Sequence, residues 1–179
     1  MKKIIVCLFL IAYCFLLIVP VHAGYVLPYP SYMPGNKLYP IARIIDKINN
    51  YWYFGIIAQS KYHLGLSDKY LVESKVLFEY KQYLLAVDAL RRSDEQVEEI
   101  PLYLQSAADQ KKDVKILRET IADAMLVHVS IIEAMRLLLP EEFIWRPEKA
   151  SETTLPISSM LQHALVVRRS VYDALNPPR

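Results

Sequence analysis

Three of the four histidines, those that follow residue 23, and two carboxylate pairs are the residues whose types and spacing could support acid–base or metal chemistry. None of His63, His128 and His163 has a second metal ligand one helical turn away. The chain also lacks an HExxH motif and the Glu-x-x-His pair that builds di-iron sites in helical bundles. The carboxylate pairs, Asp109 with Asp113 and Glu119 with Asp123, fall off the apolar seams and should face water.

His128 is the histidine with the most suggestive position, because it lies on the apolar seam expected for a helix over residues 111–139. Its functional interpretation is a metal ligand or a pH-sensitive group. The alternative, which the pattern favours, is a core histidine hydrogen-bonded to a neighbour. With four glycines in the whole chain and no GxSxG motif, the sequence also offers no phosphate-cradling loop and no nucleophile elbow. It therefore predicts no catalytic residue, no metal, no cofactor and no enzyme.

Charge and cysteine content exclude further classes of protein. The formal net charge of +2 includes Lys2 and Lys3, and without residues 1–23 the chain has 19 basic and 19 acidic side chains. This balance argues against nucleic-acid binding, which usually requires an excess of Lys and Arg. The basic pairs Arg91-Arg92, Lys111-Lys112 and Arg168-Arg169 lie near carboxylates and are expected on solvated helix faces. Cys7 and Cys14 both precede residue 24, so disulfides and thiolate sites are not expected in the remainder.

The first 23 residues have the three parts of an export signal. Lys2 and Lys3 precede an uncharged stretch over residues 4–19, and a small residue, Ala23, stands before Gly24. We expect cleavage between Ala23 and Gly24. The alternative is an uncleaved membrane anchor, although 16 apolar residues are fewer than the roughly 20 that span a bilayer comfortably.

A strap rich in proline and tyrosine follows, from Gly24 to Pro40. Its prolines exclude a long helix, so we expect an extended segment. A short helix should come next, over residues 41–54, because its isoleucines recur at helical spacing. Exposed aromatic rings here could stack on cell-wall sugars or receive a peptide, but we favour their packing over one end of the bundle as a lid. The rings are Tyr29, Tyr32, Tyr39, Tyr51 and Trp52.

Prolines, tyrosines and leucines recur in the strap at an unusual spacing, at Leu27, Pro28, Tyr29, Pro30, Pro34, Leu38 and Tyr39. With these motif residues the strap resembles the LPYPG…LP…PLY opening of an uncharacterised domain family of exported bacterial proteins, often from candidate phyla. The resemblance covers roughly residues 25–92 and departs from the family at Ser31, where glycine is usual, and at Asn36-Lys37, where proline is usual. It implies a secreted or surface-exposed helical domain and supplies no catalytic residues.

Two long helices, over residues 56–78 and 82–108, carry seams in which small and large residues alternate. Small residues every seven positions let two backbones approach closely, so we expect these helices to pack antiparallel as a tight pair. Pro101 should bend or break the second of them near Glu99. The seams are Ser60, Leu64, Ser67, Leu71, Ser74 and Phe78 in the first helix, and Tyr83, Ala86, Leu90, Ser93, Val97, Ile100, Leu104 and Ala107 in the second.

A third helix is expected over residues 111–139 and a last one within residues 155–179. The third should bury a seam of Val114, Leu117, Ile121, Ala124, His128, Ile131, Met135 and Leu138. A polar linker, residues 140–154, should join the two helices and contain one pair with a buried pattern, Phe143 and Trp145.

The predicted fold class is thus all-α: an antiparallel hairpin extended to a bundle of about four long helices, behind a strap and a short helix. Residues 24–179 should form one domain, made of the strap with its short helix (24–54), three long helices (55–139), the linker (140–154) and the C-terminal helix (155–179). We expect an exported structural or interaction module at the bacterial cell envelope, with an unknown protein or cell-wall partner. The membrane would be contacted only through residues 1–23 if these stay uncleaved. The alternatives are a ligand-binding module that uses the aromatic strap, with Tyr51 and Trp52 as its surface, and an envelope enzyme whose site is not visible in sequence.

Overall fold

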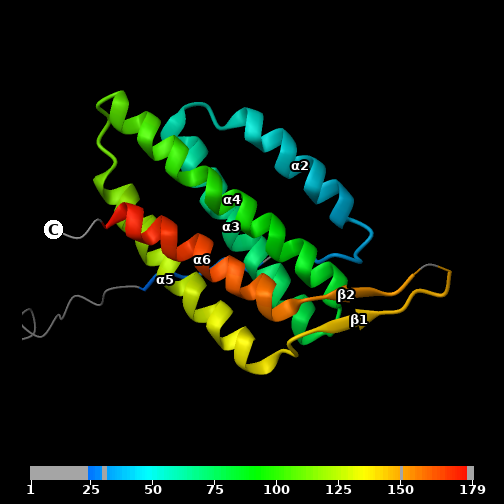
Figure 1. The fold of residues 1–179 in the computed structure, drawn as a ribbon. Helices are drawn as coiled ribbons and strands as arrows, with labels where there is room; N and C mark the ends of the chain where they lie inside the picture. Colours follow the sequence, from blue (N-terminus) through cyan, green and yellow to red (C-terminus); the bar gives the residue numbers. More distant parts are fainter. Residues whose placement is uncertain (1–23, 30–31, 150, 177–179) are drawn as a thin grey trace, which may run out of the picture.

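The computed structural model describes residues 24–29, 32–149 and 151–176. These form five α-helices and one two-stranded antiparallel sheet (Figure 1). The fold is therefore all-α, as predicted. The elements are α2 (Tyr39–Trp52), α3 (Ile56–Glu79), α4 (Tyr83–Asp109), α5 (Lys115–Leu138), β1 (Phe143–Trp145), β2 (Thr153–Leu155) and α6 (Ile157–Leu175). The predicted signal and its cleavage residue Ala23, together with Pro30 and Ser31, lie outside the described residues.

The tight helical hairpin is formed by α3 and α4, which pack against each other more extensively than any other two elements. Every residue of the two predicted seams is buried except Tyr83, which is half-buried. Two serines of the seams hydrogen-bond to the facing backbone: the Ser74 hydroxyl donates to the Ala86 carbonyl at 2.9 Å, and that of Ser93 to the Ser67 carbonyl at 2.7 Å. A side chain this short reaches the neighbouring backbone only where the two helices nearly touch, so these contacts confirm the predicted close approach.

Pro101 does not break α4, which continues without interruption from Tyr83 to Asp109. An interior proline costs roughly 3 kcal/mol because it removes one backbone hydrogen bond and crowds the preceding turn. The same turns of α4 bury Val97, Ile100 and Leu104 in the core. Burial of side chains of this size contributes about 1.5–3 kcal/mol each, which outweighs the cost of the proline.

The helices α5 and α6 complete the bundle, α5 packing on α6 and α6 also on α4. The seam of α5 is buried from Val114 to Met135, apart from the half-buried Ile131, whose neighbour Ile132 is fully buried instead. Leu138, predicted as the last seam residue, is 85% exposed. Leu138 was therefore wrongly predicted to be buried. It is exposed because it is the last residue of α5, where the chain turns away toward β1.

The predicted polar linker is a β-hairpin in part. Phe143 pairs with Leu155 and Trp145 with Thr153, in an antiparallel ribbon that projects from one end of the bundle (Figure 1). Phe143 packs on Tyr83 with ring centroids 4.4 Å apart, whereas the Trp145 side chain is partly exposed. Of the pair expected to be buried, only Phe143 therefore packs against the core.

The strap leads into α2, which forms an outer layer beside α3 (Figure 1). Between α2 and α3 the chain turns at Gly55, whose φ of 97° lies in the left-handed region that glycine adopts readily. None of the helices in the described part of the chain is both long enough and apolar enough to cross a lipid bilayer.

Candidate functional site

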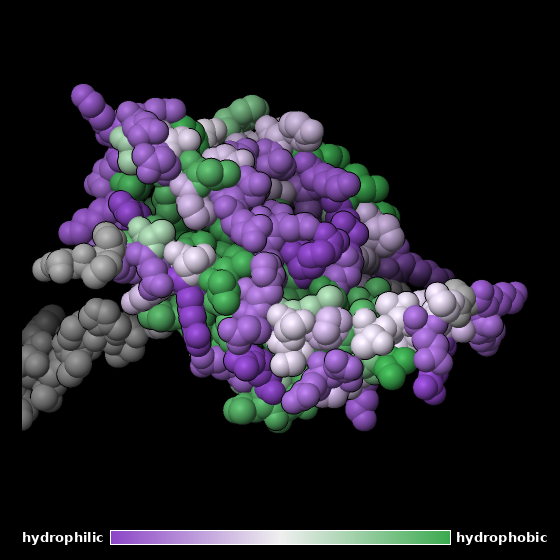
Figure 2. Space-filling view, in the orientation of Figure 1, coloured by the Kyte–Doolittle hydropathy of each residue, from purple (hydrophilic) through white to green (hydrophobic). Residues whose placement is uncertain are grey.

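The most unusual surface of the molecule is a continuous apolar stripe on α2. Five large side chains follow one another at spacings of three and four residues, and two more lie beside them, so all seven share one helix face. All are between 47% and 80% exposed. Figure 2 shows hydrophobic residues along the upper right margin of the molecule, where Figure 1 places α2. The α2 stripe consists of Leu38, Ile41, Ile45, Ile48 and Trp52, with Ile44 and Tyr51 at its side.

Polar contacts on the opposite face of α2 hold the stripe outward. The Asp46 carboxylate pairs with the Lys69 ammonium at 2.5 Å, and the Tyr62 hydroxyl donates to the Asp46 carbonyl. At the start of the helix Tyr39 is buried, and its hydroxyl donates to Glu73 Oε2 at 2.9 Å. Because these three contacts all attach the polar face to α3, burying the isoleucines instead would break them.

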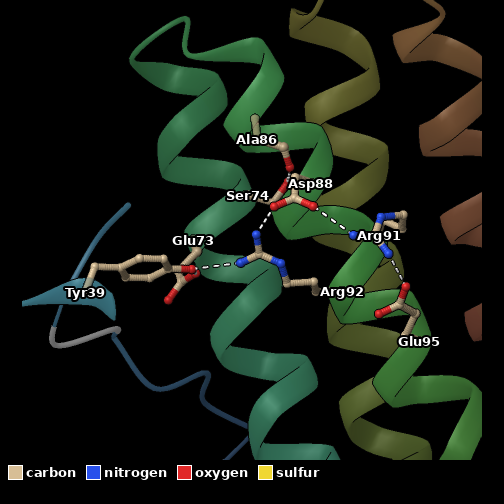
Figure 3. A network of polar contacts seen from close by, with 8 residues as sticks. All are labelled: Tyr39, Glu73, Ser74, Ala86, Asp88, Arg91, Arg92 and Glu95. Carbon is tan, nitrogen blue, oxygen red and sulfur yellow. Dashed lines mark hydrogen bonds and ion pairs between the residues drawn. The ribbon is translucent and has the colours of Figure 1, made fainter. Parts of the chain in front are cut away.

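The contact at Tyr39 belongs to a larger polar network (Figure 3). Arg92 Nη1 donates to the Tyr39 hydroxyl at 2.9 Å, and the same guanidinium pairs with Asp88. The Glu73 side chain is fully buried, and its Oε1 atom finds no hydrogen-bond partner among the described residues. Burial raises the pKa of Glu73, and burial together with the adjacent Glu73 carboxyl raises the pKa of Tyr39 to about 12. Tyr39 thus remains a hydroxyl donor at physiological pH and can anchor the start of α2.

A groove of about 440 Å³ opens between the strap and α2, next to the α2 stripe. Its walls are mostly apolar and aromatic, and the Lys69–Asp46 ion pair is its charged feature. The lining residues include Pro28, Tyr29, Tyr32, Leu38, Ile41 and Ile45.

A second polar network lies in the centre of the bundle and is built around Arg168. This side chain, predicted on a solvated face, is 0% exposed, while its neighbour Arg169 is on the surface. The prediction for Arg168 was wrong because Arg168 falls in register with the apolar face of α6, seven residues after Leu161. Arg168 Nη1 pairs with Asp94 Oδ1 at 2.5 Å, and Nη2 donates to the Ser93 hydroxyl at 2.8 Å.

His128 connects Arg168 to α3. Its Nε2 atom lies 2.8 Å from Asp68 Oδ1, and Arg168 Nε donates to its Nδ1 atom at 3.3 Å. Since Nδ1 accepts a hydrogen bond, the imidazole is neutral and carries its proton on Nε2. Burial lowers the pKa of His128, and the Arg168 charge acts in the same direction. His128 is therefore the hydrogen-bonded core histidine that the sequence favoured, here bonded to two charged groups.

The first strap residue with a fixed side-chain contact, Tyr25, joins this network. Its hydroxyl donates to Asp68 Oδ2 at 2.5 Å, so that Asp68 accepts from both Tyr25 and His128. Burial and the Asp68 carboxylate raise the pKa of Tyr25 well above its usual value. The strap is thus tied to α3 by two tyrosine hydroxyls, Tyr25 on Asp68 and Tyr39 on Glu73.

Below pH 6.5, His128 should make the folded protein progressively less stable. The lowered pKa keeps the imidazole neutral in the folded state, while the unfolded chain takes up a proton with a pKa near 6.5. Stability is therefore lost as the pH falls from 7 toward 5, by at most about 1.4 kcal/mol per pH unit for this group. In His128→Gln the amide can donate to Asp68 and accept from Arg168 without titrating, so its urea-unfolding free energy should fall less over this range. An equal pH slope in both proteins would contradict the assignment.

His63 lies apart from this network, whereas His163 lies in a groove next to one of its members, Asp94. His63 stacks on Tyr103 with ring centroids 4.9 Å apart, and its Nδ1 atom is 3.0 Å from Gln96 Oε1. His163 lines a groove of about 470 Å³ between α4 and α6, together with Asp94, Glu95 and Glu98. Asp94 in this groove already pairs with Arg168 and Glu95 with Arg91. Within the described ranges no three His, Asp or Glu side chains are placed to share a metal ion.

The five aromatic rings predicted to form one surface differ in their exposure. Tyr39 is buried, whereas Tyr29, Tyr51 and Trp52 are well exposed and Tyr32 is exposed to a lesser degree. A lid in which all five rings pack over one end of the bundle is therefore wrong, because four of the five rings are exposed. Of the other motif residues, Leu27 and Pro34 are half-buried and Pro28 and Leu38 are exposed.

The sequence indicated Tyr51 and Trp52 but neither the direction in which the isoleucines face nor the residues that fix it. Asp46 and Lys69 carry no motif, and their contact joins residues 23 positions apart. The chain matches no protein-family model, no curated protein and no solved structure at a significant level.

Proposed function

We propose that this protein is an exported interaction module of the bacterial cell envelope, and that it binds its partner through the α2 stripe. The observation that carries the proposal is the outward apolar face of α2. Contiguous exposed apolar surface of this kind is typical of interaction sites in otherwise well-packed proteins. The signal-like residues 1–23 support the location.

The architecture suits such a role because polar contacts attach the stripe-bearing helix to a well-packed bundle. Tyr39, Asp46 and Tyr62 attach α2 to α3, and α3 forms the most extensive interface of the bundle with α4. A binding face on a preorganised helix loses little conformational entropy when its partner docks.

The test measures how strongly the exported chain sediments with a cell-envelope fraction. Ile41→Gln/Ile45→Gln/Ile48→Gln should weaken binding about tenfold or more, because each isoleucine contributes apolar area that glutamine cannot replace. Ile116→Gln/Leu126→Gln/Leu137→Gln is the matched control: it makes the same kind of change at three exposed positions of α5 and should bind as the wild type does. Equal binding by both triple variants, or no binding by the wild type, would overturn the proposal.

A second function, binding of a small ligand such as a cell-wall glycan or peptide, is supported by the groove beside the stripe. Its aromatic walls, Tyr29 and Tyr32, suit stacking on sugar rings. Binding to purified cell-wall glycan that is lost in Tyr29→Ala would favour this function over the first.

A further inference from the structure

We infer that the partner of the α2 stripe is the surface of a lipid bilayer with anionic headgroups, on which α2 lies parallel to the membrane plane. This inference rests on the interaction role proposed above and names its partner. It does not depend on residues 1–23, since every residue that carries it lies between residues 37 and 73.

The first argument is the division of α2 into two faces. An interfacial helix combines one apolar face with a polar face and moderate overall hydrophobicity. In α2 the apolar face is the stripe, and the opposite face is already engaged with α3 through Asp46 and Tyr39. The apolar face would therefore offer a membrane isoleucine, leucine and the aromatic end of the helix, while the polar contacts to α3 stay intact.

The second argument is the position of the aromatic residues. Tyr51 and Trp52 end the stripe, and Phe54 follows them, also largely exposed. Tryptophan and tyrosine are enriched where a membrane meets water, because their rings are apolar and their polar atoms remain hydrated. Tyr53 does not contribute in this way, because it stacks on Tyr62 with ring centroids 4.9 Å apart.

The third argument is charge. Residues 24–54 contain three basic side chains, Lys37, Arg43 and Lys47, and one acidic side chain, Asp46, whereas residues 55–179 contain 16 basic and 18 acidic ones. Asp46 is paired with Lys69, and Arg43 is half-buried on the side of α2 that faces α3, so Lys37 and Lys47 are the exposed charges that flank the stripe, without a free carboxylate beside them. Each Lys or Arg near an anionic bilayer strengthens its attraction, and salt screens the effect.

The same features count against a second copy of this chain as the partner. The stripe extends over two heptads, whereas a stable coiled coil usually needs three or four. Two α2 helices side by side would also bring the exposed Lys37 and Lys47 of both copies near one another, without free acidic side chains of α2 to pair with them. A bilayer removes the same apolar area from water and attracts these charges.

The inference can be tested with vesicles made of equal parts phosphatidylglycerol and phosphatidylcholine, with pure phosphatidylcholine vesicles for comparison. For this test the exported chain is given the substitution Trp145→Phe, so that Trp52 is its only tryptophan. We expect its fluorescence to shift to the blue on the anionic vesicles. Binding should be about tenfold or more weaker to the neutral vesicles, in 0.5 M salt, or with Ile41→Gln/Ile45→Gln/Ile48→Gln. The α5 control Ile116→Gln/Leu126→Gln/Leu137→Gln should bind like its parent.

The outcomes separate this inference from the proposed function. Stripe-dependent binding to the envelope fraction without binding to vesicles would overturn the lipid partner and leave the interaction role standing. A lack of binding to either would overturn both. Vesicle binding that is unchanged in the stripe variant, or a stripe-dependent dimer in analytical ultracentrifugation without vesicle binding, would also overturn the inference.

Discussion

Replacing Arg168 with methionine should lower the free energy of unfolding by about 3–5 kcal/mol, because it leaves a buried carboxylate without its counter-ion. Arg168 is fully buried and donates to Asp94, Ser93 and His128. Methionine fills a similar volume, so the loss should come from the unpaired Asp94 and the unsatisfied hydrogen-bonding groups rather than from a cavity. Urea unfolding at pH 7 measures the effect.

The matched control is Arg169→Met, the same substitution one residue later. Arg169 is 53% exposed and pairs with Glu133 at 2.5 Å on the surface, where such pairs contribute about 1 kcal/mol or less. A double variant, Arg168→Met/Asp94→Leu, should recover part of the stability lost in Arg168→Met, because the buried charge is then gone. If Arg168→Met costs no more than Arg169→Met, the central ion pair does not contribute as described.

The central network has a structural role beyond its energy, because its members come from four helices. Asp68 belongs to α3, Asp94 to α4, His128 to α5 and Arg168 to α6. Apolar seams alone tolerate small shifts of one helix along another, whereas charged groups in the core are satisfied in one register only. The network therefore selects one arrangement of the bundle, and through Tyr25 it also fixes where the strap begins.

Much of this core could be predicted from residue periodicity. Spacings of three and four residues located α3 and α4 to within one residue at each end and placed His128 inside the bundle. The same periodicity also indicates that Arg168 lies on the buried face of α6, because it follows Leu161 by seven residues and precedes Val171 by three. Because both residues are basic, Arg168 and Arg169 suggested a solvated face. In α6, however, Arg168 is buried because it is in register with the apolar residues.

The orientation of α2 could not be predicted in this way. Four isoleucines at helical spacing normally mark the face that packs on the core. In this chain, contacts on the opposite face determine which side of α2 faces the bundle. Tyr39 bonds to Glu73 and Asp46 to Lys69, over sequence separations of 34 and 23 residues. Contacts between such distant residues leave no local pattern. The β-hairpin was missed for a related reason, since strands of three residues are too short to show an alternation.

The close approach of α3 and α4 leads to the second large effect: Ala86→Leu should destabilise the protein by about 2–6 kcal/mol. Ala86 is fully buried, and its carbonyl accepts the Ser74 hydroxyl of the facing helix at 2.9 Å (Figure 3). A leucine side chain here must push the helices apart, and overpacking of a core costs about 1–3 kcal/mol. Separation of the helices would also leave the buried Ser74 hydroxyl without its acceptor, at about 1–3 kcal/mol more.

Ala108→Leu provides the matched comparison, because it makes the same substitution on the same helix at an exposed position. It should change stability by no more than about 0.5 kcal/mol, as surface substitutions generally do. Thermal and urea unfolding of both variants would show whether the penalty depends on the α3–α4 interface. If Ala86→Leu is as stable as Ala108→Leu, there is room for a leucine between the helices, and the small residues of the seams do not set their separation.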